Sequence, residues 1–157
     1  MERIEKEIEV TAPLRVVYNQ WTQFEEFPKF MEGVEEVRQL DDQRLFWRAE
    51  ILGKHLEWEA EIFEQVPDQR IAWRSIMGKS NAGAVYFTGL GDKTRVRLVL
   101  DYEPQGAIEK LGDTLGILGR RVEGDLKRFR DFIEQRGRET GGWRGEIHEG
   151  KTMGRTL

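Results

Sequence analysis

Residues 106–136 read GAIEKLGDTLGILGRRVEGDLKRFRDFIEQR, and this stretch decides the fold. Its apolar side chains recur at steps of three and four residues, which places them on one helical stripe. The stripe consists of Ile108, Leu111, Leu115, Leu118, Val122, Leu126, Phe129 and Ile133. A single amphipathic helix cannot bury its own apolar stripe, so a larger layer of structure must lie against it.

The rest of the chain supplies that layer as short strands. Alternating or β-rich stretches occupy residues 3–10, 34–40, 44–51, 55–66, 70–76, 84–90 and 94–102, with a loop expected at 77–83. Thr11 and Pro13 begin a short helix, and a second, broken helix surrounds Pro28. Gly, Pro or Asp residues in the short connections favour antiparallel hairpins. We therefore predict an α+β fold, in which a curved antiparallel sheet of about seven strands wraps around the long C-terminal helix.

The strands predict a sheet with two different faces. In 44–51 and 55–66, large apolar residues such as Trp47 and Trp58 alternate with charged residues. The same parity places Trp73 and Leu98 on the apolar side. One face is therefore expected to be rich in tryptophan and to meet the helix, whereas the other carries opposite charges in solvent.

Bulk composition excludes several classes of function. The chain has 157 residues, no cysteine, 25 Lys plus Arg and 29 Asp plus Glu, for a net charge of −4. Disulfides and thiolate chemistry are excluded, and an acidic chain is a poor general binder of nucleic acid. No apolar run approaches the length of a membrane span, and the first ten residues do not resemble a signal peptide. We expect a cytoplasmic protein without stable membrane insertion.

Several segments resemble a known superfamily. The stretch VYNQWTQFEEFPKFMEGVEEVRQLDD at 17–42, together with LEWEAEIFEQVPDQRIAWRS and TRVRLVLDYEP, is similar to the START-like helix-grip superfamily. Its bacterial members are called polyketide cyclase/dehydrase or SRPBCC proteins, and it includes coenzyme Q-binding-like proteins. The resemblance covers residues 1–137. It implies a deep cavity between the sheet and the C-terminal helix, used elsewhere for lipids, quinones, sterols or polyketides, but it transfers no particular reaction.

We predict that the ligand contacts both walls of this cavity. The predicted ligand-binding residues are Phe30, Trp47, Trp58, Trp73, Tyr86, Leu98, Tyr102, Leu111, Leu115, Gly112, Gly116 and Gly119. Each glycine inside a helix costs about 1 kcal/mol relative to alanine, so the three glycines need a reason. Either they leave open volume for a ligand, which we favour, or they only permit close packing against the tryptophans.

Catalytic residue types are scarce. Ser75 and Ser80 do not lie in a nucleophile-elbow motif. The inward-parity polar candidates are Ser75, Tyr86, Thr88 and Tyr102. We predict no catalytic residue and no cofactor, and leave open whether the protein is an enzyme.

One set of residues could in principle hold a metal ion. His55, Glu57, Glu59 and Glu61 recur with period two and could share a strand face. The only other histidine, His148, lies near the C-terminus, so we interpret the set as a solvated charged face and predict no metal.

Residues 138–157 differ from the rest of the chain in being rich in glycine. We expect a flexible tail after a domain of residues 1–137, ordered only if Trp143 and Ile147 dock on something. The leading hypothesis for function is non-catalytic binding of a small hydrophobic molecule. The alternatives are a cyclase, aromatase or dehydratase-type enzyme using the same cavity, and a protein-interaction module with a closed cavity. A homodimer is left open.

Overall fold

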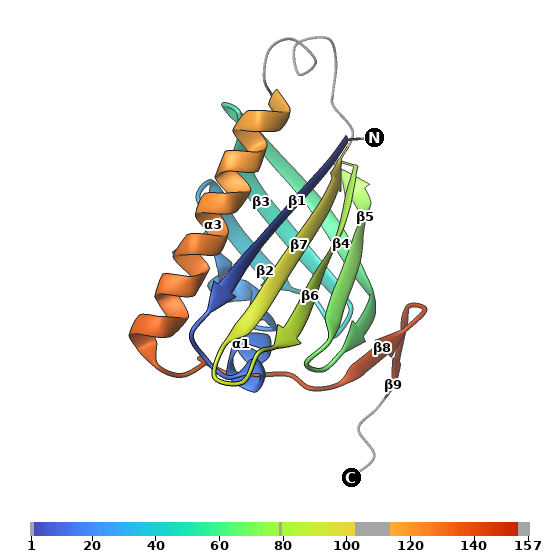
Figure 1. The fold of residues 1–157 in the computed structure, drawn as a ribbon. Coiled ribbons are helices and arrows are strands. Elements are labelled where there is room, and N and C mark those ends of the chain that lie inside the picture. Colours follow the sequence, from blue (N-terminus) through green and yellow to red (C-terminus); the bar gives the residue numbers. More distant parts are fainter. Residues whose placement is uncertain (1, 79, 103–113, 154–157) are drawn as a thin grey trace.

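The computed structural model describes residues 2–78, 80–102 and 114–153. Its central feature is an antiparallel sheet that curves around one long helix (Figure 1). Seven strands follow the order β1-β7-β6-β5-β4-β3-β2, and two short strands, β8 and β9, join at β4. The strands are β1 (Glu2–Val10), β2 (Val34–Gln39), β3 (Arg44–Ile51), β4 (Lys54–Val66), β5 (Arg70–Gly78), β6 (Asn81–Gly89), β7 (Thr94–Tyr102), β8 (Glu146–His148) and β9 (Lys151–Met153). The predicted helix-grip architecture is confirmed.

The long helix α3 (Thr114–Arg136) lies across the concave face of the sheet (Figure 1). The second half of its predicted stripe is confirmed, because Val122, Leu126, Phe129 and Ile133 are all buried in the core. The first part of the stripe, which includes Leu111, lies outside the described residues, and so does the side chain of Leu115.

Two short helices close one end of the sheet, as predicted. Helix α1 (Leu14–Trp21) buries Val17, Tyr18 and Trp21, and the 3-10 helix η1 (Phe24–Lys29) contains Pro28. Pro13 precedes α1 in an extended conformation, where its missing N–H leaves no intrahelical bond unmade. The aromatic rings of this end form an edge-to-face cluster, which includes Trp21 against Phe129 at 4.9 Å between ring centroids.

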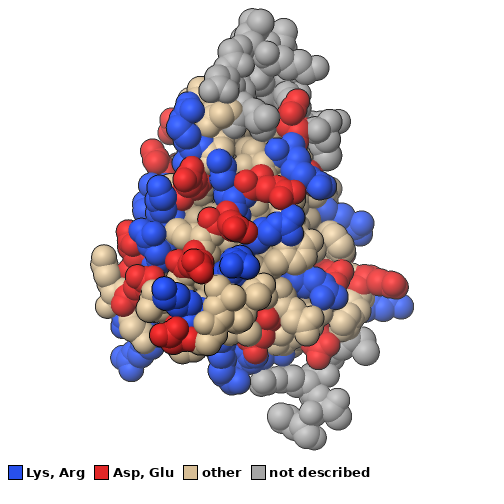
Figure 2. All heavy atoms as spheres, in the orientation of Figure 1, with Lys and Arg blue, Asp and Glu red and all other residues tan. Residues whose placement is uncertain are grey.

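The outer face of the sheet carries charges of both signs. Figure 2 shows basic and acidic side chains interspersed over the surface formed by α3, β1 and β7. Cross-strand pairs include Arg3 with Asp101 at 2.8 Å and Arg97 with Glu5 at 3.0 Å. Exposed pairs of this kind contribute little to stability, so this face serves solubility and strand register.

The loop expected at 77–83 is mostly strand. Strand β5 continues to Gly78, which pairs with Trp58 of β4, and β6 begins at Asn81, which pairs with Tyr102 of β7. The two strands pair with each other only as far as Arg74 and Ala82. Gly78 takes a φ of +91°, which favours glycine, and the Asn81 N–H donates to the Ser75 hydroxyl at 3.1 Å. The sequence did not show this extension, because residues 77–83 lack the alternation that identifies a strand.

The C-terminal segment packs against the domain through Trp143 and Ile147, the two residues on whose docking its order was expected to depend. Strand β4 has 13 residues, but β3 pairs only with its first part, Lys54 to Glu61. The exposed edge beyond Glu61 is covered by β8, with Ile147 opposite Gln65. The side chain of Ile147 is fully buried in the main core, and that of Trp143 packs against it.

A polar network holds the same segment in place. Arg144 donates to Asp68 at 2.6 Å and to Asn19 at 2.7 Å, and its guanidinium lies over the Tyr18 ring. The Tyr18 hydroxyl in turn accepts a hydrogen bond from Gln65 at 3.0 Å. Side chains far apart in the sequence therefore converge beneath the sheet.

The alkaline pH dependence of stability tests the burial of Tyr18. Burial raises the pKa of Tyr18 from 10.0 to about 12. Because the folded state holds the phenolic proton more tightly, stability is fully present below pH 10 and falls as the pH rises to about 12. The loss attributable to this group is about 2–3 kcal/mol. We expect Tyr18→Phe to flatten this part of the profile in urea denaturation at each pH, and parallel profiles for the two proteins would contradict the assignment.

Candidate functional site

A cavity of about 230 Å³ lies between the concave face of the sheet and α3. One part of its wall is formed by Trp21, Phe24 and Phe27 from the two short helices. Aliphatic side chains from the strands and from α3 complete most of the wall, and these are Ile4, Leu45, Leu56, Ile62, Ile71, Leu98, Leu100, Leu118, Val122 and Leu126. The cavity is therefore an apolar space enclosed by both main layers of the fold.

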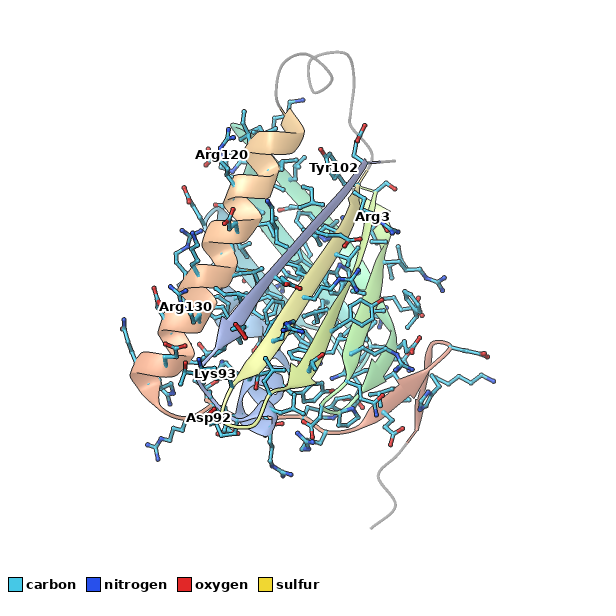
Figure 3. The ribbon with its side chains drawn as sticks, viewed as in Figure 1. Arg3, Asp92, Lys93, Tyr102, Arg120 and Arg130 are labelled. Carbon is cyan, nitrogen blue, oxygen red and sulfur yellow. The ribbon has the colours of Figure 1, made fainter. Side chains whose placement is uncertain are left out.

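Five predicted site residues lie in this wall. They are Trp47, Trp58, Trp73, Leu98 and Tyr102. The register of β3 on β4 places Trp47 directly opposite Trp58. Their rings stack with 5.7 Å between the ring centroids and 7° between the ring planes. Tyr102 ends β7 at the level where α3 begins (Figure 3). That these side chains contact a ligand stays a prediction.

The inward orientation predicted for Tyr86 is wrong. This side chain is 38% exposed and lies under the Arg97 guanidinium, 5.5 Å from the ring centroid, on the charged face. The register of β6 on β7 sets this orientation, because Tyr86 pairs with Arg97 and Phe87 pairs with Val96. Thr88 is exposed for the same reason. Both parities of β6 carry an aromatic residue, so its own pattern does not distinguish them.

Phe30 is buried but lies behind the cavity wall. Its ring packs against Phe27, Phe129 and Phe132 at 5.3–5.7 Å between centroids. The wall at this end is made by Trp21, Phe24 and Phe27 instead. The aromatic density of residues 21–30 was visible in the sequence, but it did not show which rings would face the cavity.

The described glycines of α3 do not open the cavity. A Cβ at Gly119 would meet the Lys6 side chain at 3.4 Å, so this glycine lets α3 pack closely against β1. The same lysine lies 3.8 Å from Glu123 in an ion pair. Gly116 is outside the cavity wall, and Gly112 lies outside the described residues. Gly119 therefore permits close packing, but its neighbour is Lys6 of β1 and not one of the tryptophans.

Sequence reasoning missed a polar group of wall residues beside α3. Glu32, Arg121 and Asp125 all line the cavity. The Asp125 carboxylate accepts hydrogen bonds from the Glu32 N–H at 2.9 Å and from Arg128. Burial raises the pKa of the Asp125 carboxyl, and the hydrogen bonds from Arg128 and the Glu32 N–H offset part of that rise. The sequence held one sign of this group, because positions 121 and 125 flank the apolar stripe of the helix on one side, next to Leu118 and Val122.

The remaining candidate features lie elsewhere. His55 is exposed and its ring nitrogen lies 3.0 Å from Glu35, on the outside of the sheet. Among the described residues there is no group of three His, Cys, Asp or Glu side chains placed to hold a metal ion. Within the same part of the chain, no helix has the length and apolar character needed to cross a membrane.

Comparisons with known proteins agree with the fold. An uncharacterized 17.2 kDa protein of Streptomyces lincolnensis, from the melC2-rnhH intergenic region, is 49% identical over 149 residues, which cover 94% of this chain and 99% of that protein. A crystal structure of a Thermus thermophilus protein superposes with a TM-score of 0.74 at 25% identity, covering 86% of this chain and 99% of the other. A START superfamily protein from Mycobacterium smegmatis gives a TM-score of 0.75 at 19% identity, covering 85% and 97% of the two chains.

The Zhui aromatase/cyclase from a Streptomyces species shares the same fold, with a TM-score of 0.73 at 18% identity over 90% of this chain and 99% of that one. The sequence model for polyketide cyclase / dehydrase and lipid transport proteins matches residues 10–130, which is most of the helix-grip domain. Because this match runs from the end of β1 into α3 and spans well over half of the chain, the chain belongs to the polyketide cyclase / dehydrase and lipid transport family.

Proposed function

We propose that the protein binds a small hydrophobic molecule, lipid-, quinone- or polyketide-like, in this cavity and releases it unchanged. The observation that carries the proposal is the cavity of about 230 Å³, whose wall is built mainly from tryptophan, phenylalanine and aliphatic side chains. Concave apolar sites with few polar groups are typical of small-molecule binding. Unfilled apolar volume also costs stability, so a fold that retains it needs a compensating use.

The cavity volume bounds the buried part of the ligand. An apolar cavity of about 150 Å³ holds benzene, and many ligand sites reach several hundred Å³. At about 230 Å³ this cavity fits a body of one or two fused rings, or a short aliphatic chain. A two-chain lipid would not fit inside it. The stacked pair of Trp47 and Trp58 offers a flat apolar wall for such a body.

One observation favours the catalytic alternative. Asp125 lines the cavity, and burial raises the pKa of its carboxyl, which is a property of general acids. However, this carboxylate already accepts hydrogen bonds from Arg128 and the Glu32 N–H, which restricts it as a proton donor. Binding without transformation therefore fits the contacts better. The third alternative requires a closed cavity, and the volume found argues against it.

Native mass spectrometry of protein purified from its own host tests the proposal. We expect a bound mass that organic extraction removes, and the extracted molecule should rebind and be recovered unchanged after incubation with the protein. A chemically altered product would favour the cyclase, aromatase or dehydratase-type alternative. Protein that shows only its own mass, from the host and after incubation with naphthoquinones and short fatty acids, would contradict binding.

A further inference from the structure

The two edges of α3 meet the sheet in different ways. On the β1 side, Gly119 allows close packing against Lys6. On the opposite side, long side chains of α3 reach the segment 30–33, which leads from η1 into β2. Arg128 Nε donates a hydrogen bond to the Phe30 carbonyl at 2.9 Å, and Arg121 donates one to the Glu32 carbonyl. We call this second edge, formed by Arg121, Asp125, Arg128 and residues 30–33, the polar seam. The cavity reaches it, because Glu32, Arg121 and Asp125 are wall residues.

The charges of the polar seam are not paired evenly. Arg128 is the nearest cation to both acids, since it bonds Asp125 and lies 3.6 Å from the Glu32 carboxylate. The Glu32 side chain is also 73% exposed, so solvent screens its charge. Within the part of the chain that the structure describes, no carboxylate oxygen lies within 4.0 Å of the Arg121 guanidinium. Its one hydrogen bond there, to the Glu32 carbonyl, leaves most of its five N–H donors for another acceptor.

The position of the Arg121 guanidinium depends on a glycine. A Cβ at Gly33 would collide with Arg121 Nη2, so a larger residue would displace the guanidinium. Gly33 also has a φ of +82°, which favours glycine on its own account. The backbone of residues 32 and 33 therefore provides both an acceptor and the space that holds this cation at the cavity wall.

From this arrangement we infer that the ligand is an apolar monocarboxylate whose carboxylate binds Arg121 at the polar seam, while its apolar body lies against Trp47 and Trp58. The inference rests on the proposed function and adds the head group and the orientation. A guanidinium presents parallel donors that match a carboxylate, and such charge-assisted pairs are strong when partly shielded from water. The Asp125 carboxylate also attracts the Arg121 guanidinium, but its hydrogen bonds are made with Arg128 and the Glu32 N–H, which leaves the Arg121 donors to the ligand.

A pair of shape-matched probes tests the inference by isothermal titration calorimetry at pH 7. The matched probes are 2-naphthoate and the neutral 2-naphthamide. A third probe, octanoate, shows whether the apolar body of the ligand is a ring system or a chain. We expect the protein to bind 2-naphthoate at least about tenfold more tightly than 2-naphthamide, the ratio that one charge-assisted hydrogen bond supplies. In Arg121→Gln the preference should vanish while 2-naphthamide affinity stays within about twofold, which also reports that the cavity is intact.

The matched control is Arg120→Gln. Arg120 is the neighbouring arginine, exposed and projecting from α3 outside the cavity wall (Figure 3). This variant should keep the preference for 2-naphthoate. Equal binding of both probes by the unmodified protein, or a preference that survives Arg121→Gln, would overturn the head-group inference and leave hydrophobic binding standing. Binding of none of the probes would count against the proposed function and the inference together.

Discussion

Leu118→Trp is expected to abolish hydrophobic ligand binding while changing the free energy of unfolding by less than about 1 kcal/mol. Leu118 lies on α3, lines the cavity and is only partly buried. An indole at this position can extend into about 230 Å³ of space that the protein leaves open. The substitution therefore replaces the ligand with a side chain. Calorimetric titration with 2-naphthamide measures the binding, and urea denaturation measures the stability.

Ile117→Trp provides the matched control. Ile117 is the adjacent residue on the same helix, but it is 44% exposed and is not part of the cavity wall. Tryptophan there should leave both binding and stability close to those of the unmodified protein. If Leu118→Trp instead costs about 1–3 kcal/mol and the probe still binds, the region around Leu118 is already packed and the cavity is not the ligand site.

Ile147→Ala is expected to lower the free energy of unfolding by about 2–4 kcal/mol, which is large against the roughly 5–15 kcal/mol typical of a domain. The Ile147 side chain is 0% exposed, and it belongs to the same core as Ile62 and Leu126. Truncation to alanine removes apolar contact and leaves a void beneath the end of β4. Urea denaturation followed by tryptophan fluorescence measures the change.

His148→Ala is the corresponding control, because His148 is the next residue of β8 and is exposed. Its substitution should change stability by less than about 0.5 kcal/mol. A similarly small effect for Ile147→Ala would mean that the C-terminal segment is not part of the folded core. A large effect would support moving the domain boundary from residue 137 to the end of β9.

The fold class followed from patterns that are local in the sequence. The three- and four-residue spacing of Val122, Leu126 and Phe129 identified a helix with one buried face. The alternation in β3 and β4 placed Trp47 and Trp58 on the inward face, and the strand register then sets them opposite each other. Local periodicity specifies these features because side-chain direction within one element depends only on its backbone geometry.

Features that depend on pairing between distant segments were harder to predict. Tyr86 faces solvent because the register with β7 places it opposite Arg97. Gly119 serves packing because β1, from the far end of the chain, brings Lys6 against it. Neither partner can be identified from the residues adjacent to Tyr86 or Gly119.

The residue patterns alone therefore specified the two layers and the apolar, tryptophan-rich face of the sheet, whereas the space between the layers was implied by the resemblance to the START-like superfamily. Only the three-dimensional arrangement established that the C-terminal segment pairs with the open edge of β4. It also established that Arg121 lines the cavity with N–H donors left for another acceptor. The physical reason is the range of the interactions. The spacing of apolar residues shows which side of each helix or strand faces water. Strand register, unpaired strand edges and the balance of charges arise only when residues separated by many positions come into contact.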